Sequence, residues 1–65
     1  MNLVLKGKIV ERYGSQWRFA QSLGVHEHQI SQVVRGRRVL SPEDRKRWAE
    51  KLGEDEGRLF HPEEA

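Results

Sequence analysis

The stretch from residue 16 to residue 36, QWRFAQSLGVHEHQISQVVRG, has a spacing of apolar residues and glycines that predicts two short helices joined by a tight turn. Ala20 is small enough to let two helix backbones approach closely, and Gly24 tolerates the positive φ that such a turn requires. Val25 and Ile30 are expected to fill the wedge between the two helices. Because this unit leaves one apolar side uncovered, flanking helices must complete the core.

Apolar residues at helical spacing predict one helix before this stretch and two helices within it. We expect a first helix over residues 2–13, with Asn2 as its N-cap. Its inner face is predicted to hold four apolar side chains, those of Leu5, Ile9, Val10 and Tyr13. The two helices of the central stretch are expected over residues 16–23 and 27–35, and Gly36 is expected to stop the second of them.

The clearest helix start in the chain follows the central stretch. Ser41 is a good N-cap, Pro42 fits the first helical position, and two carboxylates follow in the first turn. The inner stripe of this fourth helix is predicted to be Trp48, Ala49 and Leu52. Gly53 is expected to end it, and a short last helix is expected over residues 55–60. Residues 61–65 are expected to form a short acidic tail that frays.

Length and composition bound the class of protein. The sequence predicts an all-α fold, a compact bundle of four to five short helices with a helix-turn-helix, in one domain over residues 1–60. The 65 residues include no cysteine, so neither a disulfide nor a thiolate metal site supplements the small core. No run of about 18 apolar residues and no export signal is evident. We therefore expect a soluble cytoplasmic protein without a cofactor, a membrane contact or an evident small-molecule ligand.

The charges are distributed unevenly along the chain. Residues 1–53 carry 11 Lys and Arg against 5 Asp and Glu, whereas residues 54–65 carry 1 against 5. A positive body attracts polyanions through long-range steering and counterion release. Many basic domains have only solvated Lys and Arg faces, so this distribution favours a nucleic-acid partner without establishing one.

The central stretch matches a known motif at several fixed offsets. The matching residues are Ala20, Gly24, Val25, Ile30, Ser31 and Gly36. Over roughly residues 3–60 the chain resembles the lambda-repressor-like helix-turn-helix family, also called the XRE or Cro/C1 type. The resemblance implies five short helices, with the second crossing the DNA backbone and the third in the major groove. It also implies a sequence-specific transcriptional regulator of double-stranded DNA, most often a repressor.

The resemblance carries base contacts onto the exposed polar residues of the third helix. These residues are Glu27, His28, Gln29, Ser31 and Gln32. The Gln32 amide suits adenine N6 and N7, the His28 imidazole suits guanine, and the Glu27 carboxylate suits cytosine N4. The alternative for each is a solvated polar residue. Glu27 has the further alternative of a carboxylate that complements the positive end of its own helix.

The resemblance also implies phosphate contacts at both ends of this unit. They fall on Gln16, Arg18, Arg35, Arg37 and Arg38. Gln16 matches the family's backbone-contacting position at the start of the second helix. Three guanidinium groups within residues 35–38 are typical of backbone anchors, which supply affinity without sequence information. A solvated loop is the alternative.

Two residues depart from the family's pattern. His26 stands where a Ser or Thr usually caps the third helix, and imidazole is a poorer cap. Val34 occupies a position that is often polar, which predicts extra burial under Val39 and Leu40.

Other kinds of site receive little support. His26 and His28 are separated by about 200° around a helix and cannot share one metal ion. The chain has no nucleophile elbow and no phosphate-binding glycine loop, so we do not expect an enzyme. Trp48 is expected in the core, whereas Trp17 remains open between core, partner surface and DNA backbone.

The competing function is a helix-turn-helix module that binds a protein, such as an antitoxin or a coactivator-like adaptor. An uncovered apolar patch over Leu40, Leu59 and Phe60 would favour it, although a homodimer would use the same patch. For DNA binding we expect a homodimer on a palindromic site, paired through the last helix.

Overall fold

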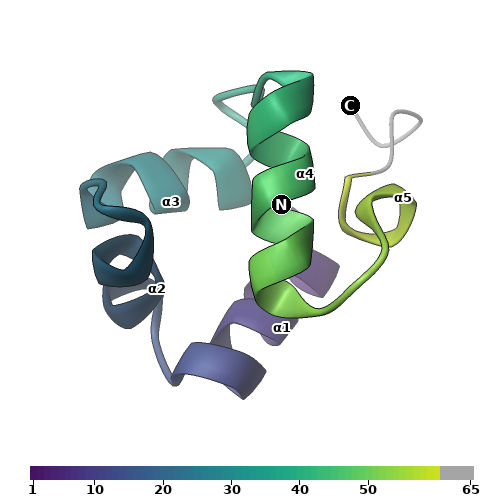
Figure 1. Ribbon diagram of the computed structural model, residues 1–65. Coiled ribbons are helices and arrows are strands. Elements are labelled where there is room, and N and C mark those ends of the chain that lie inside the picture. The colour runs from purple at the N-terminus through teal and green to yellow at the C-terminus, as the bar shows by residue number, and fades with distance from the viewer. Residues whose placement is uncertain (61–65) are drawn as a thin grey trace.

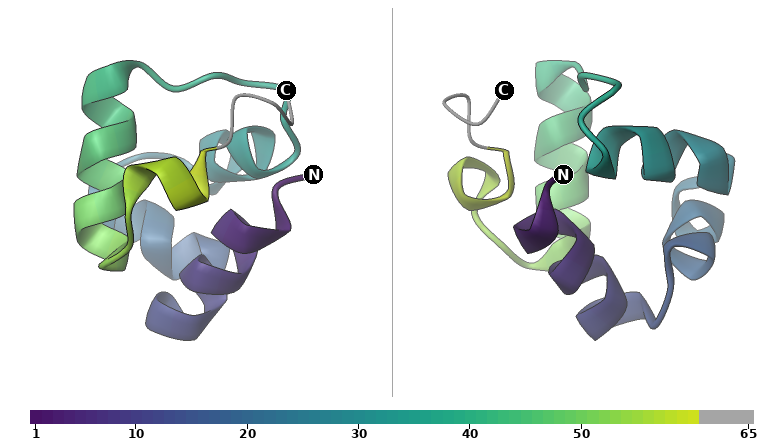
Figure 2. Two further views of the ribbon diagram at one scale, coloured as in Figure 1. Left: turned by 90° about the vertical axis from the view of Figure 1, so that its right-hand side faces the viewer. Right: turned by 180° about the vertical axis from the view of Figure 1, so that it is seen from behind.

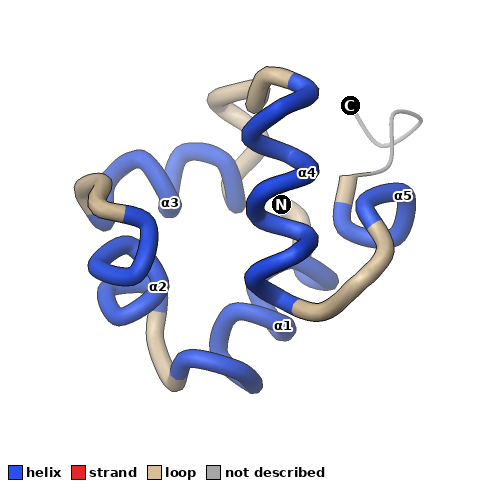
Figure 3. Tube along the Cα trace, viewed as in Figure 1, coloured by secondary structure: helices blue, strands red, loops and turns tan. Residues whose placement is uncertain are grey.

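The computed structural model describes residues 1–60 as five α-helices joined by turns, with no strand in that range (Figures 1 and 3). The helices are α1 (Leu3–Tyr13), α2 (Gln16–Leu23), α3 (Glu27–Val34), α4 (Pro42–Leu52) and α5 (Glu56–Leu59). The all-α prediction is confirmed, and the helices begin and end within a residue or two of the predicted positions. The acidic tail at residues 61–65 lies outside the described residues.

Side-chain caps explain where three of the helices begin. Asn2, Ser15 and Ser41 precede α1, α2 and α4, and each side-chain oxygen accepts a hydrogen bond from the backbone N–H three residues later, at 3.0, 3.2 and 3.2 Å. In α4, Pro42 also occupies the first turn, where its missing N–H costs nothing. The caps predicted at Asn2 and Ser41 are therefore confirmed.

The turn between α2 and α3 is closed by backbone hydrogen bonds around a glycine. The Gly24 N–H donates to the Gln21 carbonyl at 3.2 Å, and the Val25 N–H donates to the Ala20 carbonyl at 3.1 Å. Gly24 adopts φ +73°, a conformation that a residue with a Cβ rarely takes. The turn thereby sends α3 across α2 (Figure 1).

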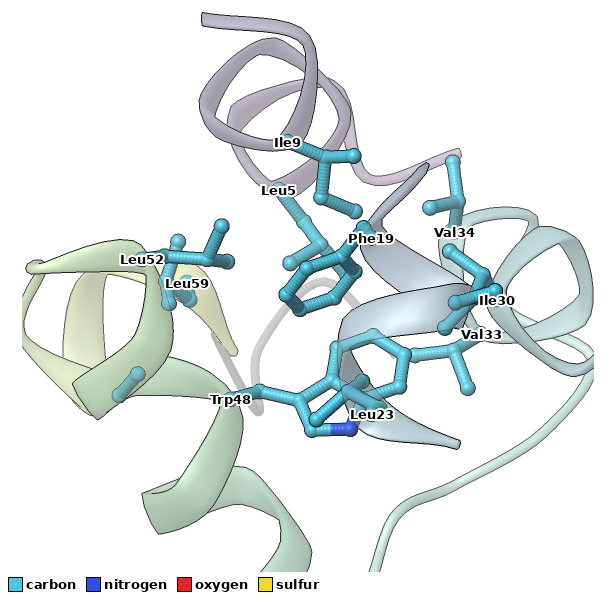
Figure 4. Packing of buried hydrophobic residues seen from close by; sticks show 12 residues of the cluster. Leu5, Ile9, Phe19, Leu23, Ile30, Val33, Val34, Trp48, Leu52 and Leu59 are labelled. Atoms are coloured by element: carbon cyan, nitrogen blue, oxygen red, sulfur yellow. The ribbon is translucent and has the colours of Figure 1, made fainter. Parts of the chain in front are cut away.

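All five helices contribute to one hydrophobic core (Figure 4). Its buried members are Leu5, Ile9, Phe19, Ala20, Leu23, Ile30, Val33, Val34, Trp48, Ala49, Leu52 and Leu59. Phe19 links the helices, because its ring centroid lies 5.0 Å from that of Tyr13 and 5.2 Å from that of Trp48, which it meets edge to face. Aromatic pairs of this kind add about 1 kcal/mol each beyond the area they bury.

Two residues predicted inside the molecule are not buried. Val10 is 48% exposed because it lies on the outer side of α1, away from the face that Leu5 and Ile9 turn inward. Val25 is 37% exposed and lies in the turn between α2 and α3, outside both helices. The predictions for Val10 and Val25 were therefore wrong.

The burial predicted for Val34 is confirmed, but its cover differs from the prediction. Val34 is buried while Val39 is 84% exposed, so Val39 does not cover it. The start of α1 approaches Val34 instead, and the Asn2 backbone N–H donates to the Val34 carbonyl at 2.7 Å. Leu40 is half-buried and packs against the core. The N-terminus of α1 is thus fastened to the C-terminal end of α3.

Two side chains tie other helix ends together. Arg47 of α4 donates through Nη2 to the Leu23 carbonyl at 3.2 Å, which satisfies an otherwise open group at the end of α2. The Tyr13 hydroxyl donates to the Lys51 carbonyl at 3.3 Å and joins the end of α1 to α4. The right-hand view of Figure 2 shows α2 and α5 on either side of α1. These ties keep α2 and α3 in a fixed relation to the other helices.

Candidate nucleic-acid interface

The outward face of α3 is a polar stripe. Ile30, Val33 and Val34 are buried, which fixes the inward side of the helix. Opposite them, His28 and Gln32 follow each other one helical turn apart, and Arg35 follows at the C-cap. His28 and Arg35 are exposed and Gln32 is half-buried.

The other predicted base-contacting residues are divided between two surfaces. Glu27 is exposed and Ser31 is half-buried, and both lie on the side of α3 next to the stripe. Gln29 is half-buried and lines a groove between α3 and α4. The structure therefore brings four of the five residues to one continuous surface and turns Gln29 toward α4.

Exposed arginines flank the stripe at its C-terminal end. Arg37 and Arg38 follow Arg35 in the turn after α3, and all three are exposed. The Arg37 backbone N–H donates to the Gln32 carbonyl at 2.9 Å, and Gly36 adopts φ +79°, so the turn folds back on the helix end as predicted. This geometry keeps the backbone of the three arginines next to the C-terminal end of α3.

The start of α2 carries the other predicted phosphate contacts. Gln16 is half-buried in the first turn of α2, and Arg18 is exposed two residues later. Between them, Trp17 is 58% exposed, whereas Trp48 is 5% exposed within the core. The prediction for Trp48 is confirmed, and the core alternative for Trp17 is excluded.

The ion pairs of the described residues involve α1, α4, α5 and the turn between α4 and α5. Lys8 approaches Glu11 at 3.6 Å and Glu54 at 3.5 Å, and Arg45 approaches Glu56 at 3.4 Å. Within residues 1–60 no such pair involves a cation of α2, of α3 or of the turn after α3. The arginines beside the stripe therefore form no ion pair with a described carboxylate, and their guanidinium groups can bind an anion.

The start of α3 lacks a side-chain cap. His26 occupies the N-cap position, and its imidazole makes no capping hydrogen bond. The Gln29 N–H is satisfied by the His26 carbonyl at 3.0 Å. The expectation that imidazole caps poorly is confirmed, and the first N–H groups of α3 stay open to solvent or to a ligand.

A groove beside the stripe was not predicted from the sequence. It has a volume of about 270 Å³ and lies between α3, the turn after it and the start of α4. Leu23, Val33 and Trp48 form apolar wall, and Arg38 and Asp44 bring charges of opposite sign. The residues that line the groove come from distant parts of the chain, so no local sequence pattern predicts it.

The side chains of this surface are hydrogen-bond donors and acceptors. Within residues 1–60, no three His, Cys, Asp or Glu side chains come together as a metal site requires. None of the helices described there has both the length and the hydropathy needed to cross a membrane. The stripe offers amide, imidazole and hydroxyl groups, with guanidinium groups around it.

Comparison with known proteins gives one match. The model of a family described as "Protein of unknown function (DUF739)" matches residues 3–52, which span α1 to α4. No curated protein and no solved structure matches the chain.

Proposed function

The chain belongs to the DUF739 family, and we propose that it is a transcriptional regulator of the lambda-repressor-like type that binds double-stranded DNA through α3. The observation that supports this proposal is the polar stripe of α3 with arginines beside it that form no ion pair with a described carboxylate. A repressor is the simplest form, because a bound domain of this size blocks access to its site.

The stripe fits the major groove in size and chemistry. An eight-residue helix such as α3 is about 12 Å long, and the major groove of B-DNA is about 12 Å wide. Gln32 lies in the middle of the stripe, where its amide would pair with adenine N6 and N7. His28 would donate to guanine, and Glu27 would accept from cytosine N4. The Ser31 hydroxyl, on the side of α3 next to the stripe, would accept or donate as the base requires.

The arginines account for affinity and orientation. Arg35, Arg37 and Arg38 at one end of α3 and Arg18 at the start of α2 would contact phosphates on either side of the groove. Gln16 would add a hydrogen bond from the first turn of α2. Each neutralised phosphate releases counterions, so binding should weaken steeply as salt is raised.

We further propose that two copies bind a two-fold site with half-sites about 34 Å apart. The sequence suggested pairing through the last helix on the strength of Leu59 and Phe60, and the structure leaves less of these two residues exposed than that suggestion assumed. Leu59 is fully buried in its own core, and the Phe60 ring lies 6.3 Å from that of Trp48. The burial of Leu59 therefore weakens the case for pairing through the last helix and favours another surface.

The experiment that tests DNA binding is selection of bound duplexes from a random pool at about 0.15 M salt. We expect a short enriched sequence arranged as an inverted repeat. On that sequence, Gln32→Ala should cost about 1 to 3 kcal/mol and relax selectivity at one position. Arg37→Ala should weaken binding to all duplexes alike and reduce the salt slope by about 1.

Arg58→Ala provides the matched control, because it removes the same charge from α5, away from the stripe. It should change affinity less than Arg37→Ala does. Failure to enrich any sequence, together with equal effects of Arg37→Ala and Arg58→Ala, would show that α3 does not read DNA.

One observation favours the alternative of a protein-binding module, an antitoxin or coactivator-like adaptor. Val25 and Val39 are exposed at the groove beside α3, where a partner's apolar side chain would fit. Under this alternative Val39→Ser should weaken partner binding, whereas under DNA binding it should leave the selected sequence unchanged.

A further inference from the structure

Helix α1 is apolar on two opposite sides. Leu5 and Ile9 are buried on the inner side. On the outer side Leu3 is 70%, Val4 is 47% and Val10 is 48% exposed. An amphipathic surface helix normally turns polar residues to water, and a helix that is apolar all round is normally covered. Within residues 1–60, no other helix therefore covers the outer side of α1.

A glycine lies in the middle of this outer side. Leu3, Gly7 and Val10 follow each other at intervals of four and three residues, which places them in one line along the helix. Gly7 weakens the interior of a helix, yet a Cβ added there would meet nothing within 4 Å. The fold of one chain gives no reason for this glycine. A second helix packed closely against α1 would give one.

We infer that the outer side of α1 pairs with the same side of a second copy of this chain, with the two helices parallel. In a parallel pair the intervals of four and three residues form a short coiled-coil seam, with Leu3 and Val10 at d positions and Gly7 at an a position. The glycine lets the two backbones approach closely between the two apolar layers. The inference stands apart from DNA binding and is tested without DNA.

Charge complementarity identifies the partner as another copy. Lys6 and Glu11 flank the seam on opposite edges, five residues apart, at g and e positions. In a parallel pair, Lys6 of each copy meets Glu11 of the other, so the two-fold axis generates two ion pairs. Lys6 makes no ion pair within residues 1–60, and the Glu11 side chain is 65% exposed beside Lys8. Both charges are thus accessible to a second chain.

The surroundings of α1 leave room for this contact. The right-hand view of Figure 2 shows α1, in purple, in front of the other described helices, with none of them covering it. The seam spans only 11 residues, so the contact is small and the pair should be weak, with a dissociation constant of about 0.1 mM.

The test is the molar mass of the full chain by sedimentation equilibrium from about 10 μM to 1 mM. We expect a monomer–dimer equilibrium. Lys6→Glu and Glu11→Lys should each raise the dimer dissociation constant about ten-fold, because each places like charges opposite one another. The double variant restores opposite charges and should return the constant to within about three-fold of the unchanged chain.

Two further variants separate pairing from folding. Gly7→Ala should also weaken the pair about ten-fold, since it separates the backbones, although it favours the helix and should raise the melting temperature of the monomer. Lys46→Glu makes the same charge change on the exposed side of α4 and should leave the mass unchanged. A chain that stays monomeric at about 1 mM, or a double variant that fails to restore association, would overturn the inference.

Discussion

Asn2 forms hydrogen bonds at the ends of three helices. Its replacement should lower the free energy of unfolding far more than an ordinary substitution near a chain end does. Its Oδ1 accepts from the Leu5 N–H at 3.0 Å and caps α1. Its Nδ2 donates to the Leu59 carbonyl at the end of α5. Its backbone N–H donates at 2.7 Å to the carbonyl of Val34, which is the last residue of α3.

The size of the effect follows from the hydrogen bonds that Asn2→Ala removes. Loss of an N-cap costs about 1 kcal/mol, and loss of the amide bond to the Leu59 carbonyl costs about 1 kcal/mol more. The backbone bond to Val34 remains. We expect the free energy of unfolding to fall by about 2 kcal/mol, which in a domain of this size lowers the melting temperature by about 8 to 16 °C.

Urea unfolding at about 10 μM protein, followed by circular dichroism, measures this change while the chain is monomeric. Asn2→Asp is the matched variant, because its carboxylate still caps α1 but cannot donate to the Leu59 carbonyl. It should recover about half of the loss. A cost below about 0.5 kcal/mol for Asn2→Ala would refute the reasoning, and an Asn2→Asp variant as stable as the unchanged chain would remove the role assigned to the bond with α5.

Three further predictions concern other parts of the molecule. Gly53→Ala should cost about 1 to 2 kcal/mol in thermal unfolding, because Gly53 adopts φ +65° and an added Cβ would lie 3.1 Å from Arg12 Nη1. The backbone N–H of Asp55 is the main cause that lowers the pKa of Glu54. The charged carboxylate therefore stabilises the fold at pH values above its ordinary pKa. The free energy of unfolding should decrease as the pH is lowered from there through the lowered pKa, and this decrease should be smaller in Glu54→Gln. Trp17 should account for most of the tryptophan emission that acrylamide quenches, so Trp17→Phe should abolish most of the quenching; bound duplex DNA should protect Trp17 if α2 lies on the backbone.

The sequence alone specified the helices and most of the core, because those signals are local. Asn2 and Ser41 have side chains that cap helices, and each comes just before apolar residues at helical spacing. Gly24 permits a positive φ, which residues with a Cβ rarely adopt. The same periodicity that turned Ile30 and Val33 inward left Gln32 and His28 on the outer side of α3. The candidate surface was therefore visible as a pattern before any neighbour was known.

The tertiary structure decided what covers each helix, because coverage depends on contacts between residues far apart in the chain. Val10 lies on the outer side of α1 and Val25 lies in the turn between α2 and α3, and whether a neighbour covers such positions cannot be predicted from spacing alone. Leu59 is buried because Asn2 binds the end of α5 and because α4 and α1 pack around it. No motif in residues 55–60 predicts these contacts. The exposed second side of α1 likewise emerged only once the helices were packed. A helix carries its own hydrogen bonds in its sequence, but its buried area is set by whichever helices the whole chain brings against it.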